Sequence, residues 1–512
     1  MLESNHCDEP EAHLISVKKP QDGTFEWIKD RPGVIDLESA GASRLVPITG
    51  MPGSGKSVLA ASLFNKFRQA MGFDHKAFYA CNGRDASRRT ARSLMSSLLA
   101  QILRTKTKKL PEHLLTEIFD GIPLPVNFDA IEPIATIFSK TCRLLRTRIL
   151  IVVDALDECD PGKDRENLIH LITEVIRNGG DTPITAIVLC RPYWDLAFED
   201  LDAKSRFHID LDGEPRVQED LRLFTAEMVK DFVKKRTGYA SLEDVILAEI
   251  FNRARGSHGG MFLMVELLID LLLRATNSSL RATRDTIDSL PDTVEEIYQR
   301  IWESIDECSR ESARHMMTWI LTMFGPVQVS DLADALAHEP FLSGDNEISD
   351  AAVDEARPRD MANDLRRLLG PFIRITVEFR REVVRVTHQT VKEYFEGPES
   401  KHAKARAMRP SLEGDFHIHV ARVCLVSLIL CGREPDVDPS HDERDRPVSL
   451  QSSTWTVVKG GTRGFHFYAR TKCIRHREAA HLAGESQPKI EEFDVLFGRT
   501  VRNAELWLQA PS

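Results

Sequence analysis

The sequence predicts an α/β fold built on a parallel sheet, followed by helical segments and a strand hairpin. Short apolar runs between residues 44 and 211 alternate with stretches of helical periodicity, which is typical of parallel strands covered on both faces. A glycine-rich turn joins the first run to the first helical stretch. After residue 213 the apolar period is helical, and it changes to an alternating pattern after residue 372.

The runs predicted as strands are LVPITG, AFYAC, ILIVVD, TAIVLC and FHIDL. One residue conflicts with this prediction, because Pro47 within the first run removes a hydrogen bond that a central strand needs. The helix after the first run is marked by apolar residues at helical spacing. We expect these residues in the core: Leu59, Leu63, Phe64, Phe67 and Met71.

The segment 213–305 is helical in period and predicts no strand. Its most apolar stretch, Met261 to Leu273, is shorter than the roughly 20 residues of a membrane-spanning helix. Glu266 and Asp270 fall on one face of this stretch. We therefore expect an amphipathic helix of a soluble protein.

The segment 306–396 predicts two helices followed by two strands, which describes a winged helix. The four elements are His315–Met323, Ser330–Leu336, Phe372–Phe379 and Val383–Thr387. Between the second helix and the first strand, the acidic stretch Ser343–Asp360 is expected to form a loop insertion.

At 512 residues the chain exceeds the size of one domain, commonly about 100 to 200 residues. We predict a lead-in, an α/β domain, a helical domain, a winged-helix domain and a helical C-terminal region. Their bounds are 1–43, 44–212, 213–305, 306–396 and 397–512.

Charge, cysteine spacing and the N-terminal sequence argue against several classes of protein. A net charge of −11 argues against a nucleic-acid binder, and the basic run Arg104 to Lys109 lacks interleaved aromatics and is expected to be a solvated loop. The nine cysteines include no CxxC pair, so neither a zinc site nor a disulfide framework is indicated. The acidic start MLESNHCDEPEAH does not resemble a signal peptide. We expect a cytoplasmic protein without nucleic-acid or membrane partners.

The sequence GMPGSGKS meets the pattern GxxxxGK[ST] in full. Glycines let backbone N–H groups turn toward phosphates, Lys56 reaches the β and γ oxygens, and Ser57 ligates Mg²⁺. A flexible glycine turn is the alternative, but the preceding strand and following helix favour phosphate binding. The residues predicted to bind the nucleotide are Gly50, Met51, Pro52, Gly53, Ser54, Gly55, Lys56, Ser57 and Val58.

The third run ends in acidic residues, ILIVVDALDECD. Asp154 at the strand tip is predicted to serve the Mg²⁺ site, and Asp157 or Glu158 to orient or deprotonate the attacking water. An acidic strand-to-helix turn is the structural alternative. The letters DECD also resemble a helicase box, but a helicase places its first aspartate at the position of Asp154.

Two further residues are candidates for contact with the nucleotide. Arg191 ends the fourth run, where a guanidinium could sense the γ-phosphate; the alternative is a surface arginine. His388 follows the second strand of the wing, where a structural role is the alternative to a nucleotide contact.

From Gly23 to Tyr468 the chain resembles fungal NACHT-type signalling NTPases of the STAND class with a nephrocystin-like N-terminal module. The resemblance rests on GTFEWI, GMPGSGKSVLAASL, RDASRRTARSLMSSLLAQIL, VVDALDEC, VLCRP, GGMFLMVELLIDLL, SLPDTVEEIYQRI, VTHQTVKEYF and HVARVCLVSL. Two departures are LVPIT in place of a tryptophan-containing strand, and Met264 in place of a tryptophan. The effector domain and terminal repeats of family members are not visible in the sequence.

The resemblance implies a switch that ADP holds closed and ATP opens, after which molecules oligomerise and activate an effector protein. It implies that His388 touches the β-phosphate of ADP. The alternatives are a scaffold that holds nucleotide without hydrolysing it and a small-molecule kinase. Adenine is favoured because no guanine-reading NKxD motif follows, so we expect ATP or ADP with Mg²⁺.

Overall fold

A computed structural model gives the fold of the chain. It describes residues 14, 17–35, 41–69, 72–83, 88–104, 112–122, 131–160, 163–178, 182–192, 201, 205–256, 260–275, 279–325, 327–342, 350–378, 380–396, 414–431 and 463–482. These residues form two compact units, 1–301 and 302–512. Most of the basic run ending at Lys109 lies outside the described residues.

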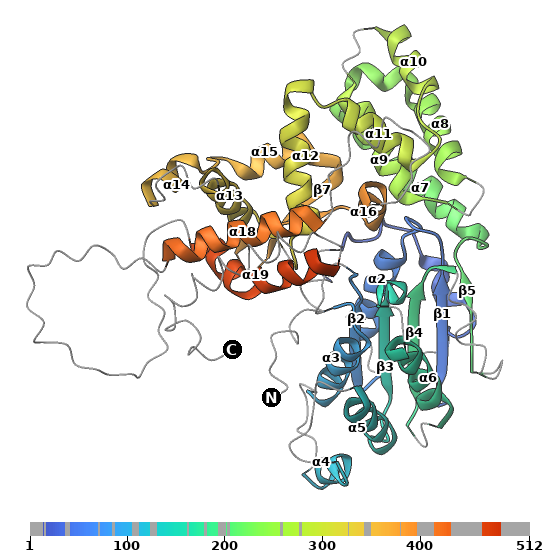
Figure 1. Ribbon diagram of the computed structural model, residues 1–512. Coiled ribbons are helices and arrows are strands. Elements are labelled where there is room, and N and C mark those ends of the chain that lie inside the picture. Colours follow the sequence, from blue (N-terminus) through green and yellow to red (C-terminus); the bar gives the residue numbers. More distant parts are fainter. Residues whose placement is uncertain are drawn as a thin grey trace, which may run out of the picture. The chain divides into compact units, whose positions relative to one another are not determined.

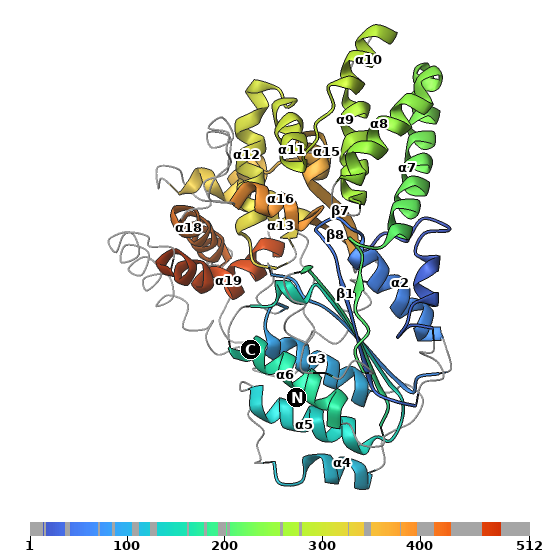
Figure 2. The ribbon, with the colours of Figure 1, turned by 90° about the vertical axis from the view of Figure 1, so that its right-hand side faces the viewer.

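A parallel sheet of five strands is the centre of the first unit (Figure 1, Figure 2). The strand order is β2-β3-β4-β1-β5, and each strand coincides with one of the predicted apolar runs. Their bounds are β1 Arg44–Thr49, β2 His75–Ala80, β3 Ile149–Asp154, β4 Ile184–Cys190 and β5 Ile209–Asp210. The prediction of an α/β fold with a parallel sheet is confirmed.

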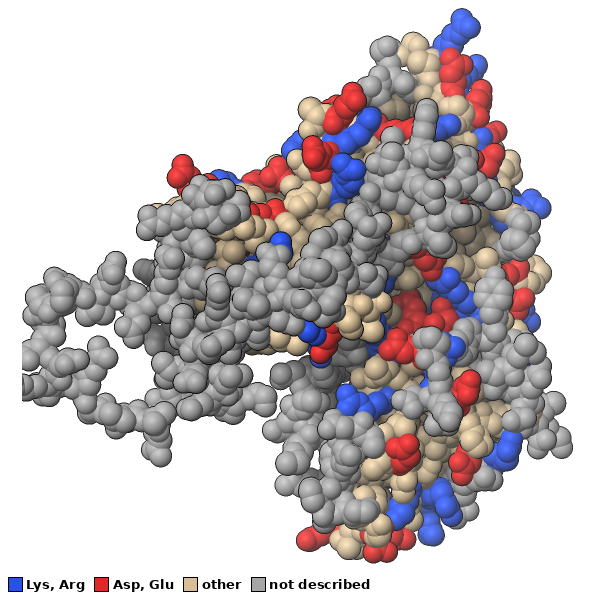
Figure 3. All heavy atoms as spheres, viewed as in Figure 1, with Lys and Arg blue, Asp and Glu red and all other residues tan. Residues whose placement is uncertain are grey.

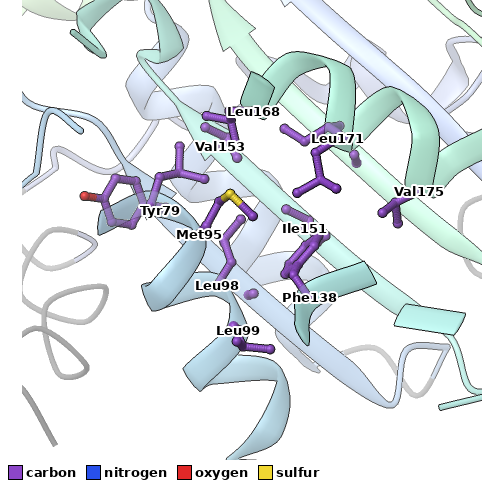
Figure 4. Close-up of a cluster of buried hydrophobic side chains, with 14 of the residues drawn as sticks. Tyr79, Met95, Leu98, Leu99, Phe138, Ile151, Val153, Leu168, Leu171 and Val175 are labelled. Atoms are coloured by element: carbon purple, nitrogen blue, oxygen red, sulfur yellow. The ribbon is translucent and has the colours of Figure 1, made fainter. Parts of the chain in front are cut away.

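Helices cover both faces of this sheet, as the continuous apolar runs require. On one face, side chains from β2 and β3 pack among α3 (Ala91–Leu103), α5 (Ile131–Leu144) and α6 (Lys163–Asn178) (Figure 4). α4 (Glu112–Phe119) adds the buried Ile118 to this core. On the other face, α2 (Lys56–Gln69) packs Leu59, Leu63, Phe64 and Phe67 against the alternate residues of the strands. Because every residue of β3 is buried, both faces of the sheet are core.

The chain before β1 is part of the core on the α2 face. Phe25, Trp27, Ile28 and Val34 are buried there, beside the short 3₁₀ helix η1 (Glu26–Asp30). This stretch lies within the segment predicted as a lead-in. Its apolar side chains pack as part of the α/β domain rather than extending ahead of it.

Pro47 is accommodated because its missing N–H faces the weaker side of β1. The N–H of Leu45 donates to the oxygen of Ser205 at 2.7 Å, and the oxygen of Leu45 accepts from Phe207 N–H at 2.9 Å. In a parallel ladder alternate residues face the same neighbour, so Pro47 also faces the β5 side. There the pairing is interrupted between the bridge at Arg206 and β5, whereas pairing with β4 continues through all of β1.

Beyond the sheet, the described part of residues 213–303 is helical and contains no strand, as predicted. The helices are α7 Pro215–Lys235, η4 Thr237–Leu242, α8 Glu243–Arg255, α9 Phe262–Arg274, α10 Leu280–Asp288 and α11 Val294–Glu303. The apolar stretch that ends at Leu273 corresponds to α9. Among the described residues, no helix combines the length and the apolar character needed to cross a membrane.

The second unit contains a small antiparallel sheet, β6-β8-β7, surrounded by helices. Its strands are β6 Val327–Gln328, β7 Ile373–Glu378 and β8 Arg381–Val386, so the predicted hairpin is confirmed. Its helices are α12 Glu307–Thr322, α13 Val329–His338, η5 Glu339–Phe341, α14 Asp350–Ala356, α15 Met361–Leu369, η6 Gly370–Phe372, α16 Gln389–Glu396, α18 Gly414–Cys431 and α19 Arg463–Leu482.

The prediction that Ser343–Asp360 is only a loop insertion is wrong for its second half, which contains α14. Residues 343–349 lie outside the described residues. Val353 in α14 is fully buried and packs in a small core with Phe341 and Val426. Ala352 of the same helix also packs against this core.

A partly buried carboxylate connects three elements of the second unit. Glu339 in η5 accepts hydrogen bonds from Nε2 of His315 at 2.8 Å, Nε1 of Trp319 at 2.9 Å and Nε2 of His419 at 2.7 Å. Burial alone would raise the pKa of Glu339, but these hydrogen bonds outweigh it and lower the pKa to about 2. The network joins α12, η5 and α18.

The first prediction concerns the ladder of β1. Val46 faces β4, so Val46→Pro removes a donor inside the sheet and leaves a buried acceptor without it, at a cost of about 1 to 3 kcal/mol or more. Pro47→Val is the matched control, and it changes stability by less than about 1 kcal/mol because it breaks no ladder hydrogen bond and removes only the chain restriction of proline. Urea unfolding monitored by circular dichroism checks both. Equal midpoints for the two variants would contradict the ladder assignment.

The second prediction concerns Glu339. A pKa near 2 in the folded chain, below the ordinary 4.5, means stabilisation that is present above pH 4.5 and lost as the pH falls toward 2. The full effect is on the order of 3 kcal/mol at neutral pH. Glu339→Gln should therefore destabilise the chain at pH 7 and much less at pH 3, as measured by thermal unfolding. The control is Glu382→Gln, which breaks an exposed pair with Arg366; a pH-independent loss in Glu339→Gln would refute the charge assignment.

Candidate functional site

The glycine-rich loop lies between β1 and α2, at the carboxyl edge of the sheet. Gly53 and Gly55 have φ values of 82° and 87°, in the left-handed region that favours glycine. A Cβ on Gly50 would lie 2.7 Å from Ser54 Oγ. The three glycines are therefore required by backbone conformation or by close packing, and α2 begins at Lys56 directly after the loop.

Two neighbouring segments pack directly on the loop glycines. A Cβ on Gly53 would lie 2.8 Å from Met261 Cγ and 3.0 Å from Leu263 Cβ, at the start of α9. A Cβ on Gly55 would lie 2.9 Å from Phe25 Cζ. The loop is thus enclosed by the beginning of α9 on one side and by the segment before β1 on the other.

Lys56 lies against the loop backbone. Its Nζ donates to the carbonyl oxygens of Gly50 at 2.6 Å and Met51 at 2.8 Å. Burial lowers the pKa of Lys56, while the nearby carboxylates of Asp157 and Asp154 act in the opposite direction. The ammonium is held where the carboxyl ends of the strands converge.

Asp154, the last residue of β3, is almost fully buried and faces Ser57 and Lys56. Burial raises the pKa of its carboxyl to about 6, although the hydrogen bond with Ser57 and the charge of Lys56 favour the ionised form. The next residue, Ala155, has a φ of 53°, a strained value for a residue with a side chain. This turn leads directly into the acidic segment.

The two carboxylates after Asp154 have different partners. Asp157 accepts from the backbone N–H of Arg191 at 3.2 Å, and its Oδ2 is 3.0 Å from Arg191 Nε. Glu158 accepts from the backbone N–H of Gly83 at 3.1 Å. The pair of Asp157 and Arg191 joins the ends of β3 and β4, whereas Glu158 points toward the end of β2.

The sequence reasoning missed Asp212. Both of its carboxylate oxygens lie 3.0 Å from the backbone N of Met51, the second residue of the loop. It also acts on the pKa of Lys56. Asp212 follows β5 at the same edge of the sheet, so the rule that located Asp154 could have located it.

His388 lies in the second unit, immediately before α16. Its Nδ1 accepts from the backbone N–H of Thr390 at 3.2 Å and lies 2.9 Å from Thr390 Oγ1. The imidazole therefore caps the first turn of α16. This is the structural role that the sequence offered as the alternative, and contact with a nucleotide stays a prediction.

The oxygen donors near the loop suit Mg²⁺. Ser57 and Asp154 are joined by a hydrogen bond between their side chains, and a hydroxyl with one carboxylate matches the preference of Mg²⁺ for hard oxygens, few protein ligands and retained water. Among the described residues no group of three or more His, Cys, Asp or Glu side chains forms a metal cage. The donors fit a metal shared with a phosphate ligand rather than one enclosed by protein.

Sequence comparison gives two matches. Residues 23–191 match the family described as Nephrocystin 3, N-terminal. The chain is also 22% identical to the vegetative incompatibility protein HET-E-1 of Podospora anserina over 525 residues, which covers 94% of this chain and 36% of that protein. The chain thus spans about a third of the length of this relative.

Solved structures give weaker similarities. Cdc6p from Pyrobaculum aerophilum has a TM-score of 0.32 and 14% identity, covering 75% of this chain and 95% of its own. The Aeropyrum pernix ORC1 protein, in complex with DNA, has a TM-score of 0.32 and 14% identity, covering 76% and 92%. These scores are too low to establish a common fold over the whole chain.

The sequence motifs and both sequence matches indicate the same kind of protein. The parallel sheet with its glycine-rich loop is the fold that these motifs predict. The match of residues 23–191 to the nephrocystin 3 N-terminal family and the similarity to a fungal incompatibility protein over most of the chain support the resemblance to fungal NACHT-type proteins.

Proposed function

We propose that the protein is a nucleotide-dependent signalling switch that binds ATP or ADP with Mg²⁺ and hydrolyses ATP slowly. One observation carries this proposal: charged side chains at the start of α2 and at the ends of β3 and β4 meet at the glycine-rich loop, namely Lys56, Asp154, Asp157 and Arg191. A cation, a buried carboxylate beside a hydroxyl, and a second cation on a neighbouring strand are the parts that phosphate chemistry uses.

The loop would hold the phosphates, since its backbone N–H groups and the N-terminus of α2 offer a site for an anion. Lys56 Nζ would exchange its contacts with Gly50 and Met51 for phosphate oxygens. Ser57 and Asp154 would hold Mg²⁺, which supplies charge neutralisation at the phosphates. That charge would also favour the ionised form of Asp154.

Glu158 is the better candidate for orienting the attacking water. Asp157 already receives two contacts from Arg191, so its carboxylate serves to position that guanidinium. Glu158 receives a backbone N–H from Gly83 and lies one residue farther from the strand. Arg191 would sense the γ-phosphate by exchanging its contact with Asp157 for a phosphate oxygen.

We interpret residues 306–396 as a winged-helix domain, because a strand hairpin follows helices and pairs with the short β6. In the switch, His388 would contribute to ADP binding from this domain. Moving a switch from 1:99 to 99:1 requires about 5.5 kcal/mol, whereas one hydrogen bond to a charged group gives about 1.5 to 3 kcal/mol. His388 would bias the switch rather than hold it alone.

The proposed partners are the nucleotide, further copies of the chain when activated, and an effector protein, with the cytoplasm as the location. On the face seen in Figure 3, basic and acidic side chains of the described residues are interspersed. A mixed surface of this kind and the net charge of −11 favour a protein that does not bind nucleic acid.

The second candidate is a scaffold that holds nucleotide without hydrolysing it. The ion pair between Asp157 and Arg191 favours this candidate, because side chains that bind each other are not in contact with the phosphates. Single-turnover hydrolysis separates the two functions, because a scaffold keeps bound ATP intact over hours. Identifying the nucleotide that co-purifies with the chain tests the choice of adenine over guanine.

The third prediction is that Lys56→Ala abolishes nucleotide binding. The ammonium contributes charged hydrogen bonds, each about 1.5 to 3 kcal/mol, so two such contacts give a loss of affinity of at least about 100-fold. Isothermal titration with Mg-ATP measures this loss. The matched control is Lys66→Ala, an exposed lysine on the same helix. Unaltered affinity in Lys56→Ala would contradict the proposed function.

The fourth prediction is that Glu158→Gln retains nucleotide affinity but slows single-turnover hydrolysis by about 100-fold or more, because general-base assistance typically contributes 10² to 10⁴. Quantifying ADP formed from bound ATP over time checks it. Glu166→Gln, an exposed residue on α6, serves as the control. If Glu158→Gln and the unmodified chain hydrolyse ATP at the same rate, Glu158 does not orient the water.

A further inference from the structure

The segment Gly23–Arg31, named here the N-terminal strap, has an anchored backbone. Phe25 has a φ of 58°, which is unfavourable for a residue with a bulky side chain. Such a conformation persists only where neighbouring groups hold it. The groups that hold the strap come from the start of α7, nearly two hundred residues later in the chain.

Asp220 of α7 is the anchor. Its side chain is buried, with 3% exposure, and Oδ2 accepts two hydrogen bonds from the strap. The backbone N–H of Phe25 donates at 2.9 Å and Nε1 of Trp27 donates at 2.7 Å. A single carboxylate oxygen thus fixes both the strained backbone and the indole ring.

Two arginines lie near the indole of Trp27, Arg31 from the strap itself and Arg216 from α7. The guanidinium carbons of Arg31 and Arg216 lie 5.8 Å and 5.1 Å from the ring centroid of Trp27, within the range of cation–π attraction. Both arginines pair with Glu214, whose side chain is buried at the start of α7. The strap and the first turn of α7 therefore form one interlocked polar cluster.

The other side of the strap reaches the phosphate loop. The ring of Phe25 lies against Gly55, where a Cβ would come within 2.9 Å of Phe25 Cζ. Phe25 also packs on Phe262 at the start of α9, with ring centroids 5.8 Å apart, and Phe262 packs on Phe224 of α7. Movement of Gly55 toward the strap would therefore meet the ring of Phe25.

We propose that Asp220 is a positioning residue that holds the N-terminal strap against Gly55, so that the strap retains nucleotide in the loop and slows its release. This inference rests on the proposed binding of nucleotide at Lys56. It identifies the N-terminal strap as the segment that controls how fast the nucleotide dissociates. Coupling of this kind is reciprocal. Nucleotide in the loop should therefore stabilise the strap by the same factor by which the strap stabilises nucleotide.

The fifth prediction follows from removing the anchor. In Asp220→Ala the N–H groups of Phe25 and Trp27 lose a charged acceptor, and we expect fluorescent Mg-ATP to dissociate roughly tenfold faster with its association rate changed less than twofold. Asp220→Asn keeps an acceptor oxygen and should give an intermediate rate. Stopped-flow displacement by excess ATP measures dissociation. Asp231→Asn, an exposed aspartate on α7, is the control.

Trp27→Phe provides an independent route, because it removes the indole donor and keeps an aromatic ring. If both residues act through one hydrogen bond, the double variant Asp220→Ala with Trp27→Phe releases nucleotide about as fast as Asp220→Ala alone. Additive effects in the double variant would refute the shared contact. Trp27→Phe decides the question if Asp220→Ala does not fold.

Hydrogen exchange of the strap in the full chain tests reciprocity. Adding Mg-ATP should slow exchange at the amide of Phe25 in the unmodified chain and have no effect in Lys56→Ala. Unchanged exchange on binding, or unchanged dissociation in both strap variants, overturns the role of Asp220 while leaving the proposed function intact. Absence of Mg-ATP binding to the unmodified chain instead overturns the proposed function, and the strap proposal with it.

Discussion

Close packing on the glycines of the phosphate loop is the constraint on which the rest of the first unit depends. Gly53 and Gly55 adopt left-handed backbone conformations, and each has a neighbouring side chain where a Cβ would lie. Met261 from the start of α9 occupies one position, and Phe25 from the strap occupies the other. The loop that is proposed to present its N–H groups to an anion is thereby also the contact point for two segments remote in sequence. The same two glycines therefore determine the conformation of the loop and the packing of these segments on it.

The parallel register of the sheet explains the chemistry around that loop. β3 pairs with β4 and β4 pairs with β1, all in the same direction, so the carboxyl ends of the strands meet at one edge. The register therefore brings residues that are far apart in the sequence, such as Asp154 and Arg191, to the same edge of the sheet. No local sequence signal links these two residues. The ion pair between Asp157 and Arg191 then links the segments that follow β3 and β4. In the proposed switch, the same pair is the contact that a γ-phosphate would have to disrupt.

The sheet, the loop and the acidic motif could be predicted from the sequence because each has a strong local pattern. The helix α14 and the role of the segment before β1 could not, and Asp212 was missed although it follows β5 at the same edge of the sheet. Asp212 acts through the backbone of Met51, and its own surroundings in the sequence are an ordinary Asp-Gly turn. Trp27 and Asp220 are 193 positions apart, so their hydrogen bond has no periodicity to reveal it. Pro47 looked unfavourable because the sequence does not say which neighbour its missing N–H faces. Tertiary pairing decides that question.

The electrostatics of the loop bear on which form of nucleotide can bind. Three carboxylates, Asp154, Asp157 and Asp212, act on Lys56, with Arg191 as the second nearby cation. This surplus of carboxylates would oppose a bare triphosphate, which brings further negative charge. A divalent cation that arrives with the phosphates removes part of this repulsion, and it also favours the ionised form of Asp154, whose pKa burial raises to about 6. Burial therefore disfavours the ionised form of Asp154 by itself, whereas a bound divalent cation would stabilise that form. On this argument the proposed site would recognise the metal–nucleotide complex as a unit, because neither the metal nor the nucleotide alone would balance the charges around Lys56.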